Sequence, residues 1–378
     1  MSAIDSSATD TSAPIRVAES HAAPLYFLGP WPDLLAMGGF GLLLWGALRV
    51  AGDPALDPEA TGVAQALAWA AVLFHYPHFA AAAWPLYSRM DRIKRHAATA
   101  LIWPLVLLAV MLVCLRHSTT FLPFFCKLAL LWIGYHYAAQ THGLGLLYLR
   151  RAGFPADRVS RLLLGSIAFA PIFYALVCLD IRVQGADFGR LAQGIRPLGL
   201  PDAFPLAALA GVCLSVAGVA ALAIHLKLKH ERALPPVVLL PAAVQLLWFV
   251  PGAAECDPYV RFASFGLVHG LQYLALAAVV EIKEVRTQDP SLTRAQLGRD
   301  VLLYYVILIA FGAAAFVGLP WLLGTLRVAR HVLEPTLIAL LWAHHAFLDG
   351  VLWKPRTPAA AALADFSFAQ LPEPEAQP

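Results

Sequence analysis

The chain has 378 residues, of which 60% are hydrophobic and 13% are charged, and its formal net charge is +3. Soluble domains carry about 45–50% apolar and about 25% charged residues, so a water-soluble core cannot hold this excess of apolar side chains. The composition excludes a disordered chain and a disulfide scaffold, and the small net charge argues against nucleic-acid binding. We therefore expect an integral membrane protein that is surrounded by membrane lipids and has no nucleic-acid partner.

The apolar residues are grouped into long runs. A helix that crosses the hydrocarbon core of a bilayer needs about 20 apolar residues. Ten such runs are separated by polar, Pro or Gly residues, and we place them at 33–50, 62–85, 98–115, 121–149, 162–179, 203–226, 235–251, 260–281, 301–324 and 332–353. These runs are too long for the strands of a barrel. The sequence therefore predicts an all-α polytopic integral membrane protein with about ten transmembrane helices in a single bundle.

The two ends of the chain are more polar than the part between them. Residues 1–32 and 354–378 are predicted as disordered or flexible tails on either side of a transmembrane domain at 33–353. Lys and Arg are concentrated in the connections after the even-numbered runs, for example at 89–95 and 150–161. Because basic connections remain in the cytosol, this alternation predicts a multi-pass protein of the plasma (inner) membrane with both termini cytosolic.

Histidines are unusually frequent inside the predicted helices. Of 13 histidines, seven lie within the runs: His75, His78, His136, His142, His269, His344 and His345. An ionisable side chain in the bilayer is costly and indicates a functional site. His75, His136 and His269 each stand 14 residues before the first basic residue after their run. At 1.5 Å per residue, all seven lie roughly 12–21 Å from the cytosolic headgroups, in one layer shared by four helices.

Other polar side chains share helix faces with these histidines. The pairs at three- or four-residue spacing are His75 with His78, His136 with Gln140, His269 with Gln272, and His345 with Asp349. We predict all seven histidines as metal ligands, although His142 lies about 120° around the helix from His136. Gln140, Gln272 and Asp349 would complete or orient the ligand set. Tyr135, Tyr137 and Tyr273 would donate to a bound oxygen species or pack between helices. Pro77 would leave a backbone carbonyl free to act as a ligand itself or to accept a hydrogen bond from an imidazole.

The donor types limit the chemistry. Imidazole suits iron, copper and zinc, whereas a hard cation would need more carboxylates. Non-haem iron that handles O2 fits best, with copper or haem as alternatives, and both O2 and a lipophilic substrate would enter from the bilayer. The predicted activity is that of a hydroxylase, desaturase or dioxygenase acting on a lipid or isoprenoid, with electrons from a separate cytosolic donor. The alternative is a proton-coupled transporter or channel lined by histidines, although the half-repeats and mid-membrane acids of transporters are not recognisable.

Two resemblances support oxidative chemistry. The histidine-rich helices resemble the general plan of membrane desaturases and hydroxylases, whose histidine boxes hold a pair of irons near the cytosolic face. That resemblance implies iron and a lipid substrate, although the box spacings of that family are not present and His344–His345 is the one adjacent pair. The segment Trp342–Phe347 is similar to the short run that carries the paired copper ligands of haem–copper oxidases, which implies copper as the alternative metal.

Overall fold

The computed structural model describes residues 24–54, 61–183, 197–252, 258–325 and 330–352, together with 363, 366–368 and 371. Within these ranges the regular structure is helical and includes no strand. Eight helical segments of the described chain are long and apolar enough to cross a membrane: Pro30–Ala51, Thr61–Tyr87, Ala98–Arg116, Phe121–Arg151, Arg158–Ile181, Phe204–His230, Val260–Gln288 and Arg294–Gly324. This confirms the prediction of an all-α polytopic membrane protein.

Helices occupy most of both halves of the described chain. The N-terminal half contains α1 (Pro30–Leu34), η1 (Leu35–Gly39), α2 (Phe40–Ala51), α3 (Thr61–Tyr87), α4 (Met90–Arg95), η2 (Ala98–Ile102), α5 (Trp103–Arg116), α6 (Phe121–Arg151) and α7 (Arg158–Val183). The C-terminal half contains α8 (Phe204–His230), α9 (Pro236–Phe249), α10 (Pro258–Gln288), α11 (Arg294–Ala313), η4 (Ala314–Gly318), α12 (Leu319–Gly324) and α13 (Arg330–Leu352). The η elements are π-helical turns: η1 and η4 each join two helices into one apolar segment, and η2 begins the segment that α5 continues.

Every predicted run falls on a helix, but two of the ten do not meet the requirements for a membrane span. Helix α9 has 14 residues, a length of about 21 Å, which is shorter than a hydrocarbon core of about 30 Å. Helix α13 is long enough, with 23 residues, but its polar residues, among them His345 and Asp349, lower its mean hydropathy. These two helices therefore depend on protein neighbours for much of their surroundings.

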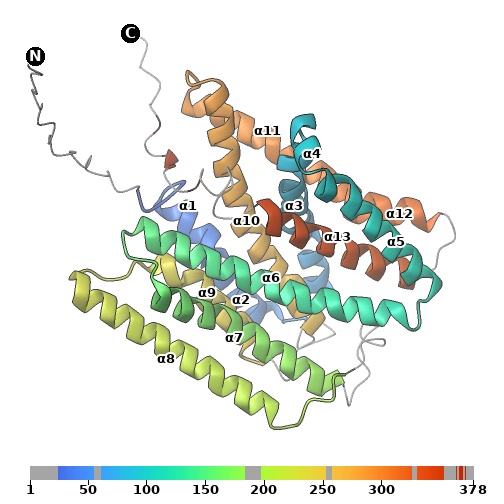
Figure 1. Ribbon diagram of the computed structural model, residues 1–378, viewed down its shortest axis with the longest axis horizontal. Coiled ribbons are helices and arrows are strands. Elements are labelled where there is room, and N and C mark those ends of the chain that lie inside the picture. Colours follow the sequence, from blue (N-terminus) through green and yellow to red (C-terminus); the bar gives the residue numbers. More distant parts are fainter. Residues whose placement is uncertain are drawn as a thin grey trace, which may run out of the picture.

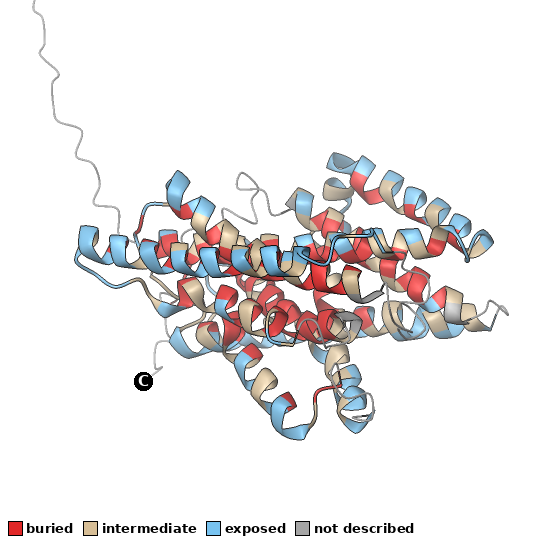
Figure 2. Cartoon of the chain, turned by 90° about the horizontal axis from the view of Figure 1, so that it is seen from below, coloured by how far each residue is buried: buried red, intermediate tan, exposed pale blue. Residues whose placement is uncertain are grey.

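Helix α10 lies at the centre of the bundle. Figure 1 shows α10 and α3 crossing behind α6 and α13, with α8 at one edge and α12 at the other. Of the residues in the apolar stretch of α10, 72% are buried inside the protein. The corresponding share for the segment from α11 to α12 is 17%. Figure 2 shows the buried residues gathered in the middle of the bundle, while the outer helices present exposed faces. The peripheral helices therefore face lipid and the central ones enclose the core.

Glycines let α3 approach its two neighbours closely. A Cβ placed at Gly270 of α10 would collide with the backbone carbonyl of Phe74 on α3. A Cβ at Gly312 of α11 would lie 2.6 Å from the carbonyl carbon of Tyr76. Small residues at such contacts let the backbones of transmembrane helices pack directly. As a result, α3 is held between α10 and α11.

Pro77 interrupts the hydrogen-bond pattern of α3. A proline has no N–H, so the carbonyl of Leu73, four residues earlier, loses its helical partner. That carbonyl accepts from the hydroxyl of Tyr305 on α11. The nearby carbonyl of His75 accepts from Nδ1 of His78. The prediction that an imidazole would take the carbonyl freed by Pro77 therefore differs from the structure, because a tyrosine takes it and the imidazole binds a neighbouring carbonyl.

The two ends of the described chain meet at Arg151, a buried residue that closes α6. Its guanidinium donates to the backbone carbonyls of Pro24, Leu25, Tyr26, Leu363 and Phe366. A buried guanidinium is stable only when its donors find acceptors, and these segments supply them. Residues 24–32 and the described residues after 362 therefore pack against the end of α6, and the other residues of the two predicted tails lie outside the described part of the chain.

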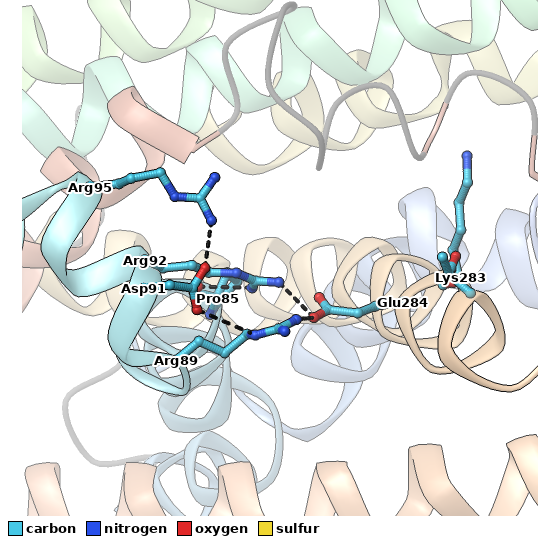
Figure 3. A network of polar contacts seen from close by, with 8 residues as sticks. Pro85, Arg89, Asp91, Arg92, Arg95, Lys283 and Glu284 are labelled. Atoms are coloured by element: carbon cyan, nitrogen blue, oxygen red, sulfur yellow. Dashed lines mark hydrogen bonds and ion pairs between the residues drawn. The ribbon is translucent and has the colours of Figure 1, made fainter.

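The basic connections also meet at this end of the molecule. Glu284, near the end of α10, accepts from Arg89 at 3.0 Å and from Arg92 at 2.6 Å (Figure 3). Just after α10, Arg294 donates to the Leu371 carbonyl at 3.0 Å. The connection at 89–95, the end of α10 and both ends of the described chain therefore lie on one side of the molecule.

Candidate metal centre

Four helices each bring one imidazole to the centre of the bundle: His78 from α3, His136 from α6, His269 from α10 and His345 from α13. The ring centroid of His136 lies 4.8 Å from those of both His269 and His345. The ring centroid of His78 lies 5.1 Å from that of His269 and 4.6 Å from that of His345. His269 and His345 are 6.0 Å apart, so His78 and His136 each bridge the same pair.

The ring nitrogens approach one another within this group. Nε2 of His136 lies 3.2 Å from Nε2 of His269 and 3.1 Å from Nε2 of His345. A neutral imidazole has one donor and one acceptor nitrogen, so a single Nε2 cannot make good hydrogen bonds to both partners. Two nitrogens bound to one ion at about 2.0–2.1 Å, side by side rather than opposite, are about 2.8–3.4 Å apart. The observed spacing is that of ligands which share an ion.

A carboxylate joins the nitrogens. Oδ2 of Asp349 lies 3.5 Å from Nε2 of His136 and 3.4 Å from Nε2 of His345. In the described chain, the ligand atoms fall into two groups, each within 4.8 Å, that share His345: His78 with His269 and His345, and His136 with His345 and Asp349. We refer to these five side chains, His78, His136, His269, His345 and Asp349, as the cluster. The side chains of this cluster could bind a metal ion.

A backbone contact selects the nitrogen that His78 presents. Nδ1 of His78 faces the carbonyl oxygen of His75. A carbonyl can only accept, so this Nδ1 carries the proton and donates. The lone pair is then on Nε2, which is the form in which a histidine binds a metal while its other nitrogen is held by the protein.

The two predicted amides lie beside the cluster and bind the backbone. Nε2 of Gln140 donates to the His269 carbonyl at 3.2 Å and to Oε1 of Gln272 at 3.0 Å. Nε2 of Gln272 donates in turn to the Met37 carbonyl in the π-helical turn η1, at 2.9 Å. The amides therefore tie α6 to α10 and α10 to η1, and in this way they hold the helix that carries His269.

The three tyrosines named from the sequence have different surroundings. The Tyr273 hydroxyl donates to Oδ1 of Asp349 at 2.9 Å. The Tyr137 ring lies 4.6 Å from that of His269, and its hydroxyl donates to the backbone. Tyr135 is 60% exposed and packs on Phe169, so the structure does not bring it to the cluster.

Three of the seven predicted histidines lie outside the two groups. His75 is buried with its ring 4.9 Å from that of His78, packed against Gly266. Nε2 of His142 contacts the Arg161 carbonyl at 3.1 Å, so this ring faces α7. Nε2 of His344 contacts the Tyr87 hydroxyl at 3.2 Å.

Helical phase explains why these residues diverge. Successive residues of a helix are turned by about 100°, so His344 points away from the side that His345 occupies. His142, six residues after His136, is turned by about 120°. Depth in the membrane could not distinguish these histidines, whereas the angular position on each helix could have done so. His75 shares a helix face with His78, but its ring packs against Gly266 and is in neither ligand group. We therefore leave His75, His142 and His344 out of the ligand set that we propose.

The side chains of the cluster are almost completely shielded from solvent. His78 and His269 are each 1% exposed, and His345 is 3% exposed. The side chains of His136 and Asp349 are 12% and 11% exposed. Electrostatic interactions in such a site are stronger than in water, because the effective dielectric constant is lower. The less enclosed edge of the cluster lies on α6 and α13.

Comparisons with known proteins identify no relative. No protein-family model, no curated protein and no solved structure matches the chain. A function must therefore be inferred from the chemistry of the cluster and from its place in the membrane.

Proposed function

We propose that the cluster holds an iron ion and that the protein is an integral-membrane oxidoreductase that uses O2 to oxidise a lipid or isoprenoid. The observation that carries this proposal is the triangle of His136 Nε2, His345 Nε2 and Asp349 Oδ2, whose sides are 3.1, 3.4 and 3.5 Å. Two histidines and one carboxylate on one face of the ion form the ligand set of non-haem Fe(II) oxygenases. Iron would supply the activation of O2.

The donor set also separates iron from other metals. Mg²⁺ and Ca²⁺ prefer oxygen ligands, whereas four of the five side chains in the cluster are imidazoles. A haem with two axial histidines would separate their nitrogens by about 4.1 Å across the iron, twice a bond of about 2.0–2.1 Å. The contacts of His136 are 3.2 and 3.1 Å, and rings packed this closely leave no space for a macrocycle. An ion bound directly by the side chains is therefore favoured over a haem, with copper as the alternative metal.

The protein would position the substrate at the site and exclude water from it. The buried rings of His78 and His269 close the inner side of the site. A hydrocarbon from the bilayer would reach the cluster on the side of His136 and Asp349, which are its more exposed members. The side that carries both ends of the described chain also carries basic connections, and this supports a cytosolic location of that side and a cytosolic electron donor. The membrane that we propose is the plasma membrane.

Metal analysis of the detergent-purified protein tests the proposal. We expect about one iron per chain in the wild type and loss of this iron in His136→Ala. His142→Ala is the matched control on the same helix, and it should keep the iron because His142 contacts the Arg161 carbonyl instead. Folded wild-type protein that takes up neither iron nor copper would contradict the proposal.

The oxidation itself is tested in cells. Lipid extracts from cells that express the wild type should contain an oxidised lipid or isoprenoid that is missing when His136→Ala is expressed or O2 is removed. Flux into proteoliposomes that depends on a pH gradient, without any oxidised product, would instead favour the transporter.

A further inference from the structure

The two oxygens of Asp349 have different neighbours. Oδ2 faces the nitrogens of His345 and His136, at 3.4 and 3.5 Å. Oδ1 accepts the hydrogen bond from the Tyr273 hydroxyl at 2.9 Å. One carboxylate thus connects the cluster on α13 with a tyrosine on α10.

We propose that Tyr273 is a positioning residue, which restricts Asp349 to binding the ion through one oxygen; this inference rests on the proposed function. A free carboxylate can bind an ion through both oxygens. A hydrogen bond to Oδ1 competes with that second bond, because it uses the oxygen that would make it. His136, His345 and one oxygen of Asp349 occupy three positions of an octahedral ion, so binding of Asp349 through a single oxygen keeps a position open for an exogenous ligand.

The surroundings of Tyr273 suit this role. The residue is 3% exposed, and its ring lies 5.9 Å from that of His78 and 5.5 Å from that of His345. Its ring belongs to an apolar group that includes Ala81 of α3 and Tyr304 of α11. Because neighbours from several helices hold the ring, the hydroxyl has a defined position relative to Asp349. Because the hydroxyl donates its hydrogen bond to Oδ1, Tyr273 acts through Asp349 rather than on a bound oxygen species.

Tyr273→Phe tests the inference, because it removes the hydroxyl and keeps the ring. We expect Fe(II) binding to weaken about 10- to 100-fold, as is usual when a partner of a metal ligand is removed. We also expect the iron-loaded variant to bind azide more weakly, because the released Asp349 would occupy the open position with its second oxygen. Tyr135→Phe is the matched control on an exposed tyrosine, and it should change neither value.

The outcomes separate this inference from the proposed function. Wild-type protein that binds no metal would contradict both the inference about Tyr273 and the proposed function. Iron in the wild type, with unchanged iron and azide binding in Tyr273→Phe, would overturn the inference and leave the proposed function intact. Unchanged binding with loss of the oxidised lipid would also overturn it, because the hydroxyl would then act on the substrate. Infrared carboxylate bands of the iron-loaded wild type give an independent measurement if Tyr273→Phe does not fold, and a pattern of two-oxygen binding would overturn the inference.

Discussion

At the scale of single residues, two adjacent histidines illustrate how a helix separates a ligand from a neighbour. His345 brings Nε2 to 3.1 Å from that of His136, whereas Nε2 of His344 lies 3.2 Å from the Tyr87 hydroxyl. The same residue type at the same depth therefore has two roles, because a turn of about 100° directs the two rings toward different helices.

This difference gives a prediction for the adjacent pair. His345→Ala should lose the iron, because His345 belongs to both groups of ligand atoms. His344→Ala should keep it and lose only a hydrogen bond between helices, which contributes about 0.6 kcal/mol on average in a membrane protein. Metal content and thermal stability of the two purified variants in detergent measure both effects. Equal loss of iron from the two variants would show that the ligand set is wrong.

At the scale of helices, the spacing of α3 and α10 sets the geometry of the cluster. His78 and His269 belong to these helices, and their ring centroids are 5.1 Å apart. The helices approach this closely because Gly270 has no side chain where it meets the backbone of Phe74.

We therefore expect Gly270→Ala to separate the two helices. The added methyl group would collide with a backbone carbonyl that cannot rotate away, and overpacking of this kind costs about 1–3 kcal/mol. Thermal unfolding should shift downwards and iron binding should weaken. Gly143→Ala on α6 is the control, because no heavy atom lies within 4 Å of its Cβ position. A glycine replaced at a compatible position gains about 0.4–1 kcal/mol, so similar losses of stability in both variants would argue against the close contact.

At the scale of the whole molecule, one side chain holds both ends of the described chain. Arg151 donates to carbonyls that lie before α1 and after α13. The N-terminal segment and the last described residues are thus parts of one apolar core, in which Phe27 and Phe366 are buried.

Arg151→Met should release these ends while keeping the length of the apolar stem. Each carbonyl left buried without a partner costs about 1–3 kcal/mol, so the segments should detach rather than remain in place. Limited proteolysis of the detergent-solubilised protein should then cut the terminal segments faster. Arg150→Met is the control, since Arg150 is exposed while its neighbour is buried. Unchanged cleavage in Arg151→Met would contradict the proposed importance of this contact.

The sequence by itself determined the class of the protein and the positions of its helices. An excess of apolar residues can be accommodated only in lipid, and lipid requires helices whose backbone groups bond internally. The density of histidines at one depth, including His78, His136, His269 and His345, also followed from counting along the chain. These properties depend on composition and on distance along a helix, which a sequence displays directly.

The tertiary structure alone decided which side chains meet. It placed His142 and His344 against other helices and set the Tyr273 hydroxyl on one oxygen of Asp349. It also brought the ends of the described chain together around Arg151. Such contacts join residues that are far apart in sequence. They depend on the rotation of each helix and on which neighbour lies beside it, and both are set by the packing of the whole bundle.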